Sequence, residues 1–392
     1  MKRLIALLCL VALICTGCAK SAPKETQADT TAPTTEPTTE ATEPTMPEPI
    51  PPAPTFDPME IVATMTLEER VGQIFLACCP TSGAAEDVSQ YHLGGIFLFG
   101  RDFANDTPES ISQKIAGYQD AADIPLIISV DEEGGVVCRI SSYPQYREAP
   151  FLSPRLLYAW GGFEMVYETE AEKCQLLRSL GINVNASPIC DISTDPKAFI
   201  YSRSFGQDPV TTGTFVAGVC NVMAENGISG ILKHFPGYGN NTDTHEGIVV
   251  DDRPLEELES VDLVPFAMGI AGGAQAIMVS HTFINAIDPD YPATLSPKVI
   301  QYLREDMGFE GVIVTDELSM AGVSYLYGSG EAAVRAVLAG NDMICSWIYE
   351  THYNAVLAAV QSGRIPEATL NQAVARVLQW KYNMGLLAED AI

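Results

Sequence analysis

Basic side chains are scarce in this chain, which has 22 Lys and Arg against 50 Asp and Glu among 392 residues. The formal net charge is −28. Nucleic acids and anionic membrane surfaces are bound by clustered Lys and Arg. The charge balance therefore argues against either as a direct partner, and we expect no nucleic-acid partner.

Signatures of metal and nucleotide sites are also missing. The ten cysteines form no C-x-x-C pair outside the N-terminal leader, and the five histidines form no H-x-H pair. Structural zinc sites and one-metal hydrolase barrels usually show such pairs. No G-x-G-x-x-G follows a predicted strand. The sequence predicts no metal and no cofactor, and most cysteines, which lie in apolar runs, are expected to be buried thiols.

The chain has one apolar leader. Lys2 and Arg3 precede a charge-free run from Leu4 to Gly17, which is too short to span a bilayer comfortably. These proportions are typical of a signal peptide, which we assign to residues 1–17. The run ends in CTGC, which resembles a bacterial lipobox although Cys15 stands where Leu is usual. We expect lipidation of Cys18; the alternative is a plain secreted protein.

Residues 18–57 change in character, with abundant Thr, Pro and Glu and almost no large apolar side chains. Such a segment cannot bury enough surface to offset the entropy of ordering. We expect a disordered tether that holds a folded domain, residues 58–392, away from a membrane. The predicted location is extracytoplasmic, with the lipid anchoring the protein to the bacterial cell membrane.

The folded part alternates short apolar runs with longer helical patterns. A run without charged residues, Leu263 to Ser280, reaches membrane-span length, but its Gly272-Gly273 pair favours a helix end, a turn and a buried strand. The predicted strands are Ile74–Cys79, Gly95–Phe99, Leu126–Asp131, Ile182–Asp191, Gly230–His234, Ala276–His281, Val312–Asp316 and Met343–Trp347.

The predicted helices lie between these strands. Strands that are apolar on both faces and alternate with helices indicate a parallel sheet. Eight such units fit a single (β/α)₈ barrel of the TIM type in the α/β class, with a doubly wound open sheet as the alternative. The predicted helices include Pro108–Ala122, Phe163–Leu180, Pro209–Asn226, Pro254–Ala271, Ser296–Met307 and Gly330–Ala339.

Acids, bases and imidazoles follow five of the predicted strands, where the chemistry of a barrel is found. Each alone has an ordinary structural explanation: Asp316 could cap a helix, and His234 could be a core histidine. Their joint placement at strand ends favours a catalytic site. The residues are Asp131, Arg139, Asp191, Arg203, Lys233, His234, His281 and Asp316.

The segment LKHFPGYG at 232–239, followed by Asp243-Thr244-His245, resembles the signature of glycoside hydrolase family 3. The likeness is to the branch of single-barrel β-N-acetylhexosaminidases, and it covers almost the whole folded part. Further motifs in the same order are GGIFLF at 94–99, VDEEGG at 130–135, RSFGQDP at 203–209, SH at 280–281, PATLS at 292–296 and VTDELSM at 314–320.

The resemblance implies roles for these residues. Asp316 matches the nucleophile that forms a glycosyl-enzyme, and Asp243 with His245 matches the pair that protonates the leaving oxygen and then activates water. Retaining hydrolysis needs a nucleophile and a proton donor on either side of one bond, and an imidazole oriented by a carboxylate is a workable donor. The residues that match holders of the sugar hydroxyls are Asp131, Arg139, Arg203, Lys233 and His234.

Three features depart from the family pattern. Tyr238 stands where His is usual, the loop from His234 to His245 is one residue shorter than expected, and Val136 follows the Gly pair where Arg is common. The first two affect the loop that carries the predicted acid, and the third affects the sugar-binding motif.

The sequence thus predicts a retaining β-N-acetylhexosaminidase that releases terminal N-acetylglucosamine from peptidoglycan fragments or chitin-type oligosaccharides. We expect a monomer whose partners are its carbohydrate substrate and, through the lipid alone, the membrane. The alternatives are a glycoside phosphorylase or β-glucosidase of the same family, or a carbohydrate-binding lipoprotein without catalysis.

Overall fold

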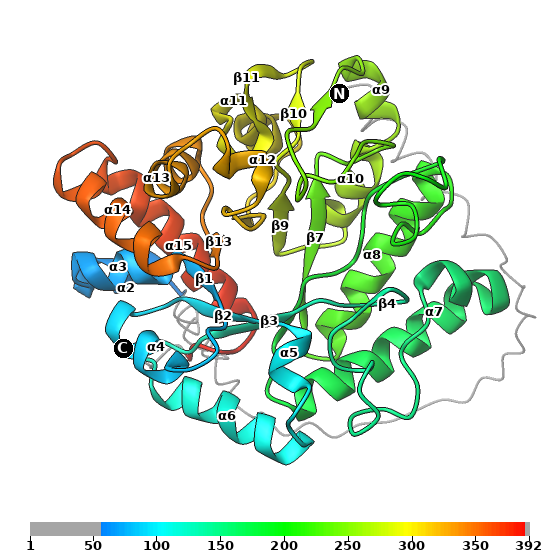
Figure 1. Ribbon diagram of the computed structural model, residues 1–392, viewed down its shortest axis with the longest axis horizontal. Coiled ribbons are helices and arrows are strands. Elements are labelled where there is room, and N and C mark those ends of the chain that lie inside the picture. The colour runs from blue at the N-terminus through cyan, green and yellow to red at the C-terminus, as the bar shows by residue number, and fades with distance from the viewer. Residues whose placement is uncertain (1–55, 389–392) are drawn as a thin grey trace, which may run out of the picture. The chain divides into compact units, whose positions relative to one another are not determined.

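The computed structural model describes residues 56–388 of the chain (Figure 1). The predicted signal peptide, Cys18 and nearly all of the predicted tether lie outside the described residues. Eight parallel strands form one sheet in the order β12-β9-β7-β6-β3-β2-β1-β13. They are β1 (Phe75–Cys78), β2 (Gly95–Leu98), β3 (Ile127–Val130), β6 (Val184–Asn185), β7 (Ser229–Phe235), β9 (Ala276–Val279), β12 (Val312–Thr315) and β13 (Ile344–Ser346).

The first and last strands of this order meet, so the sheet nearly closes into a barrel. A parallel bridge joins Val314 of β12 to Met343 at the start of β13. The backbone N–H of Thr315 donates to the Met343 carbonyl at 3.0 Å, and the N–H of Cys345 donates to the Thr315 hydroxyl at 3.0 Å. This arrangement is consistent with the predicted TIM-type barrel and excludes the open sheet.

All eight predicted strands are present, but the fourth is much shorter than Ile182–Asp191. Strand β6 holds only Val184 and Asn185. Pro188, which has no N–H to donate to a ladder, interrupts the run, and pairing resumes at one bridge between Ile189 and Lys233.

The helices pack around the strands (Figure 1). They are α2 (Pro58–Thr64), α3 (Leu67–Gln73), α4 (Ala84–Tyr91), α5 (Gly100–Phe103), α6 (Pro108–Asp120), α7 (Pro154–Ser179), α8 (Pro209–Glu225), α9 (Leu255–Ser260), α10 (Leu263–Ala271), α11 (Pro297–Gln301), α12 (Ala321–Ser324), α13 (Ser329–Ala339), α14 (Tyr349–Gln361) and α15 (Glu367–Asn383), with short turns η2 (Ala293–Leu295) and η3 (Tyr302–Asp306).

Two predicted helices differ from the structure. The predicted Pro254–Ala271 is two helices, α9 and α10, and Ser296–Met307 divides into α11 and η3. Element α7 is itself two helices joined at a kink, where Gly161 and Gly162 are non-helical and Gly162 has a φ of 65°. The helix after the kink begins at Phe163, as predicted. The helix before it was not predicted; it starts at Pro154, where the Ser153 side chain accepts the Leu156 N–H.

Five short strands were not predicted, because runs of two to five residues give little periodic signal. Strands β4 (Glu132–Gly134) and β5 (Val137–Cys138) form a hairpin after β3. Strands β8 (Val250–Asp251), β10 (Phe283–Ile284) and β11 (Asp288–Pro292) form a small sheet. All follow the carboxyl ends of barrel strands, so they shape the catalytic rim.

Alternate side chains of the strands fill the barrel interior, as period-two geometry requires. Val312 and Val314 of β12 and Ile231 of β7 belong to this inner cluster. Trp380 of α15 joins it at the amino-terminal end of the strands, where its indole N–H donates to Ser229 at 2.8 Å. The opposite end, where the strands finish, is left for polar side chains.

Two further expectations concern the described residues. Leu263–Ser280 folds as α10, a turn and β9, as predicted, and within residues 56–388 no helix has the length and apolar character needed to cross a membrane. The cysteines in this range are free thiols, and all except the partly exposed Cys138 are buried, which confirms the prediction for them.

Candidate active site

The inward register of the strands brings three predicted site residues together at the rim. Asp316 follows Val314 by two residues, Lys233 follows Ile231, and Asp131 follows Ser129 in the same way. Side chains two apart on a strand share a face, so all three point over the barrel interior at its carboxyl end. The structure therefore places these three predicted residues together at the carboxyl end of the barrel.

An ion-pair network links Asp131 to its neighbours. The Lys233 ammonium lies 2.6 Å from Asp131 Oδ1 and 2.8 Å from Glu133 Oε1. Arg139 reaches Asp131 Oδ2 at 3.4 Å. Buried Glu132 accepts the Ile140 N–H at 2.8 Å, which fixes the segment that carries Arg139.

Glu133 is a site residue that the sequence analysis missed, although it lies within the VDEEGG motif. Its carboxylate receives Arg203 Nε at 3.0 Å and a second guanidinium nitrogen at 2.7 Å. Burial raises the pKa of Glu133, but Lys233 and Arg203 outweigh it and hold that pKa well below its usual value. The adjacent acids of the motif were the only available signal, and they did not show which one turns inward.

Asp191 orients the predicted sugar-binding residue His234. One carboxylate oxygen of Asp191 accepts the His234 backbone N–H at 3.0 Å and lies 2.8 Å from its Nδ1. The other accepts the Tyr238 N–H at 2.8 Å. The Nε2 of His234 lies 3.4 Å from Arg203. Asp191 therefore fixes which ring nitrogen faces the site.

The carboxylate of Asp316 lies among imidazoles. Burial raises the pKa of Asp316, but His281, His234 and His245 together with the Glu317 N–H, which donates to Asp316 Oδ1 at 2.8 Å, outweigh it and lower that pKa. Asp316 is thus held as the anion, the form that a nucleophile needs.

His281 supports the loop that follows Asp316. It is fully buried, with Nδ1 2.7 Å from the Thr294 hydroxyl and Nε2 2.9 Å from the Glu317 carbonyl. A carbonyl only accepts, so Nε2 carries the hydrogen. The SH and PATLS motifs therefore meet to fix the backbone next to Asp316.

The predicted acid/base pair forms on the loop after β7. Asp243 Oδ1 lies 2.6 Å from His245 Nδ1 and accepts the His245 backbone N–H at 2.9 Å. The His245 side chain is 58% exposed. Thr244, between the two residues, accepts the Gly322 N–H through its backbone carbonyl at 3.0 Å, which joins this loop to the segment after Asp316.

Two asparagines anchor this acid/base loop. Asn240 Oδ1 accepts the Ser193 hydroxyl at 2.9 Å and the backbone N–H groups of Thr194 and Asp195 at 2.9 and 3.1 Å. Asn241 donates to Asp251 at 3.0 Å. The loop is thereby attached on both sides just before Asp243.

The departures from the family pattern also have structural consequences. Tyr238 is buried, and its hydroxyl lies 2.5 Å from that of Thr244, so it connects the two ends of the shortened loop. The Thr244 carbonyl accepts the Gly322 N–H at 3.0 Å, which links this loop to the segment after Asp316. Val136 lies between β4 and β5 and is 68% exposed, so an apolar side chain stands where the family usually has Arg.

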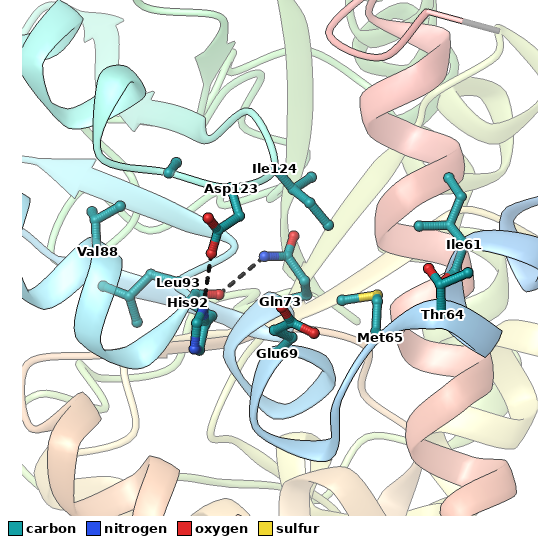
Figure 2. A pocket seen from close by; sticks show the side chains of 11 residues that line it. Ile61, Thr64, Met65, Glu69, Gln73, Val88, His92, Leu93, Asp123 and Ile124 are labelled. Atoms are coloured by element: carbon teal, nitrogen blue, oxygen red, sulfur yellow. Dashed lines mark hydrogen bonds and ion pairs between the residues drawn. The ribbon is translucent and has the colours of Figure 1, made fainter. Parts of the chain in front are cut away.

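A separate cavity of about 210 Å³ lies at the opposite, amino-terminal end of β1–β3 (Figure 2). Donor atoms of Glu69, His92 and Asp123 come within 4.8 Å of one another there. Figure 2 shows His92 turned toward Asp123, and the distance between them is 3.0 Å. Glu69 accepts the Thr66 N–H at 2.6 Å as part of a helix cap. These groups are already paired, and the predicted catalytic residues lie at the other end of the barrel.

Comparisons with known proteins agree with this geometry. "Beta-hexosaminidase LpqI" of Mycobacterium tuberculosis is 29% identical over 357 residues, which are 86% of this chain and 89% of that protein. A "Beta-hexosaminidase" of Xylella fastidiosa strain M12 is 35% identical over 306 residues, 76% of this chain and 88% of that protein.

Solved structures give the same result. A glycoside hydrolase family 3 β-N-acetylglucosaminidase from Paenibacillus sp. str. FPU-7 superposes with a TM-score of 0.77 at 34% identity, covering 83% of this chain and 64% of that chain. M. tuberculosis LpqI gives 0.75 at 28% identity, covering 83% and 96%. Residues 66–380 match the model of the glycosyl hydrolase family 3 N-terminal domain. The chain belongs to glycosyl hydrolase family 3.

Proposed function

We propose that this chain is a retaining β-N-acetylhexosaminidase that removes terminal N-acetylglucosamine from a glycan. The observation that carries the proposal is the presence on one rim of the Asp316 carboxylate and a separate Asp243–His245 dyad, whose loop is joined to the segment after Asp316 by the hydrogen bond from the Gly322 N–H to the Thr244 carbonyl. The relatives named β-hexosaminidase, which this chain matches over most of their length, support the same activity.

In the first step the Asp316 carboxylate attacks the anomeric carbon, and the bond from that carbon to the leaving oxygen breaks. His245 gives its proton to the leaving oxygen, while Asp243 contacts Nδ1 and orients the ring. The lowered pKa of Asp316 keeps the nucleophile ionised at neutral pH. The result is a glycosyl-enzyme on Asp316.

In the second step the imidazole of His245 has lost its proton and takes one from a water molecule. The water oxygen attacks the anomeric carbon, and the bond to Asp316 breaks, which restores both groups. Two displacements at one carbon retain the β configuration.

The polar network supplies the pocket for the sugar that is cleaved off. Asp131 can accept from hydroxyl groups, and Lys233, Arg203 and Arg139 can donate to them. Because Glu133 and Asp191 fix these cations and His234 beforehand, the pocket loses little entropy on binding. The exposed Val136 leaves acetamido recognition to other groups.

Natural substrate and location form a second part of the proposal. The signal-peptide proportions of residues 1–17 and the lipobox-like CTGC support an extracytoplasmic protein anchored through Cys18. An enzyme held there on a tether would act on peptidoglycan fragments or chitin-type oligosaccharides. Fractionation of cells with the Cys18→Ala form tests this: release from membranes is expected, and unchanged membrane association would refute the anchor.

The activity is tested by comparing hydrolysis of an aryl β-N-acetylglucosaminide with that of an aryl β-glucoside. Preference for the acetamido sugar, with the β anomer as first product by NMR, is expected. Preference for the glucoside would overturn the substrate, and an α anomer would overturn the retaining mechanism. Sugar 1-phosphate formed in phosphate buffer would identify a phosphorylase.

A further inference from the structure

Two aromatic side chains, just after strands β2 and β13, lie on the face of each strand that points into the barrel. Phe97 and Cys345 belong to the inner cluster, and Phe99 packs against it. Phe99 and Trp347 follow these residues by two positions. Phe99 and Trp347 therefore occupy the same level of the rim as Asp131 and Asp316.

The two rings pack against each other. Their centroids are 4.4 Å apart at an interplanar angle of 31°. The Arg101 guanidinium lies 4.6 Å from the indole centroid, and this arginine also donates to the Cys79 carbonyl. We call Phe99 and Trp347 the aromatic wall. It is a fixed surface, because a cation and a second ring hold the indole in place.

The aromatic wall spans the gap between the nucleophile and the sugar-binding acid. On one side the backbone N–H of Trp347 donates to Glu317 Oε1 at 3.0 Å, and Glu317 directly follows Asp316. On the other side Leu98 pairs with Val130, so Phe99 lies beside the strand that ends in Asp131. The rim thus has a polar arc, from Asp316 through Lys233 to Asp131, and an aromatic arc.

The polar and aromatic arcs differ in exposure. The Lys233 side chain is 3% exposed, whereas Trp347 is 37% exposed. A sugar that is bound by its hydroxyl groups fits the deep polar arc. The leaving group departs toward solvent, on the more open side, and an aromatic surface there offers contact with the apolar C–H face of a pyranose ring.

We propose that the aromatic wall, Phe99 and Trp347, is a subsite for the leaving-group sugar. It packs against the pyranose ring that is attached through the scissile oxygen, and so selects oligosaccharides over glycosides of small alcohols. This inference rests on the proposed function and deepens it, because it names the part of the substrate beyond the bond that is cleaved.

The test compares two substrates with the same N-acetylglucosamine and different leaving groups: N,N′-diacetylchitobiose and methyl β-N-acetylglucosaminide. Trp347→Ala should lower kcat/KM for the disaccharide about tenfold, equivalent to about 1.4 kcal/mol, mainly through KM. The methyl glycoside should change by less than about twofold. Trp347→Phe should restore most of the loss, because it keeps a ring.

Trp160→Ala serves as the matched control, since Trp160 is an indole exposed on α7. It should leave both substrates unchanged. Equal losses on the two substrates in Trp347→Ala would place the wall in the pocket for the cleaved sugar, and no loss on either would remove the subsite; both results overturn the proposal.

If the proposed function is wrong, the result differs: the unaltered protein then hydrolyses neither the disaccharide nor the methyl glycoside. Calorimetry then still tests the aromatic wall: affinity for the disaccharide should fall in Trp347→Ala while affinity for N-acetylglucosamine is kept. Loss of both affinities, or of neither, would refute the wall as a leaving-group subsite.

Discussion

The Glu133 carboxylate and the Arg203 guanidinium form a two-point ion pair, with nitrogen–oxygen distances of 3.0 and 2.7 Å. The same carboxylate also receives Lys233 at 2.8 Å. Glu133 therefore fixes two cations of the sugar pocket without being one of the family residues that the sequence analysis assigned to sugar binding. Its position makes it a positioning residue for the proposed reaction.

Replacing Glu133 with Gln should raise KM for an aryl β-N-acetylglucosaminide more than it lowers kcat, because Arg203 and Lys233 lose their fixed geometry. Leaving the buried Arg203 guanidinium without its carboxylate should also cost about 3 kcal/mol in the free energy of unfolding. Steady-state kinetics and urea unfolding measure the two effects. Glu172→Gln, which breaks the exposed pair with Arg147, is the control and should change neither quantity appreciably. An unchanged KM in Glu133→Gln would contradict the positioning role.

Asp316→Asn should lower kcat at least about a thousandfold, because an amide cannot form the glycosyl-enzyme. Binding of N-acetylglucosamine, measured by calorimetry, should persist, since Asp131, Lys233 and Arg203 are unchanged. In the unaltered enzyme, the lowered pKa of Asp316 means that activity is kept as pH falls until this carboxylate protonates below its usual range. A near-normal rate in Asp316→Asn would show that another group is the nucleophile.

The sequence allowed the barrel and much of the rim to be predicted, since apolar strands and period-two geometry place Asp131, Lys233 and Asp316 together. Glu133 was missed because neighbouring acids in a motif do not reveal which one enters a pocket. The predicted helix Pro254–Ala271 is two helices because of tertiary packing, and the sequence pattern, which is helical throughout, contains no sign of the break. The roles of Asn240 and Asn241 depend on contacts with segments distant in sequence, Ser193–Asp195 and Asp251.

The asparagine anchors give a prediction about the acid/base loop. Asn240→Ala removes four hydrogen bonds that hold the loop before Asp243, three accepted by Oδ1 and one donated by Nδ2 to the Thr194 hydroxyl, so His245 should be positioned less well. We expect the rate on substrates with poor leaving groups to fall about tenfold while activated aryl substrates change little, because only poor leaving groups need the proton. His245→Ala should show the same pattern more strongly.

The measurement is the dependence of kcat/KM on leaving-group pKa for a series of aryl glycosides, which should become steeper in both variants. Asn354→Ala is the control, because this side chain bonds only to the Glu350 carbonyl of its own helix among the contacts of the described residues. Equal slowing across the series in Asn240→Ala would indicate a general loss of structure rather than a displaced acid.

Lys381 gives a prediction about stability. It is fully buried on α15, and its ammonium lies 2.7 Å from Gln73 Oε1, an uncharged acceptor. Burial lowers the pKa of Lys381 from 10.5 to about 7. Between these values the unfolded chain binds the proton and the folded chain does not, so this residue makes stability rise with pH from about 7 to 10.5. Below pH 7 both states bind the proton, and the full penalty, on the order of 5 kcal/mol, is present.

Lys381→Met should therefore raise the free energy of unfolding at and below pH 7 and lose most of the gain by pH 10. The difference between the variant and the unaltered protein is the quantity to measure, by urea unfolding at several pH values, because the contributions of buried Cys and Tyr groups cancel in it. Lys197→Met, at an exposed side chain, is the matched control and should give a flat difference. A flat difference for Lys381→Met as well would show that Lys381 stays charged in the folded protein, and that water or a rearranged Gln73 stabilises it there.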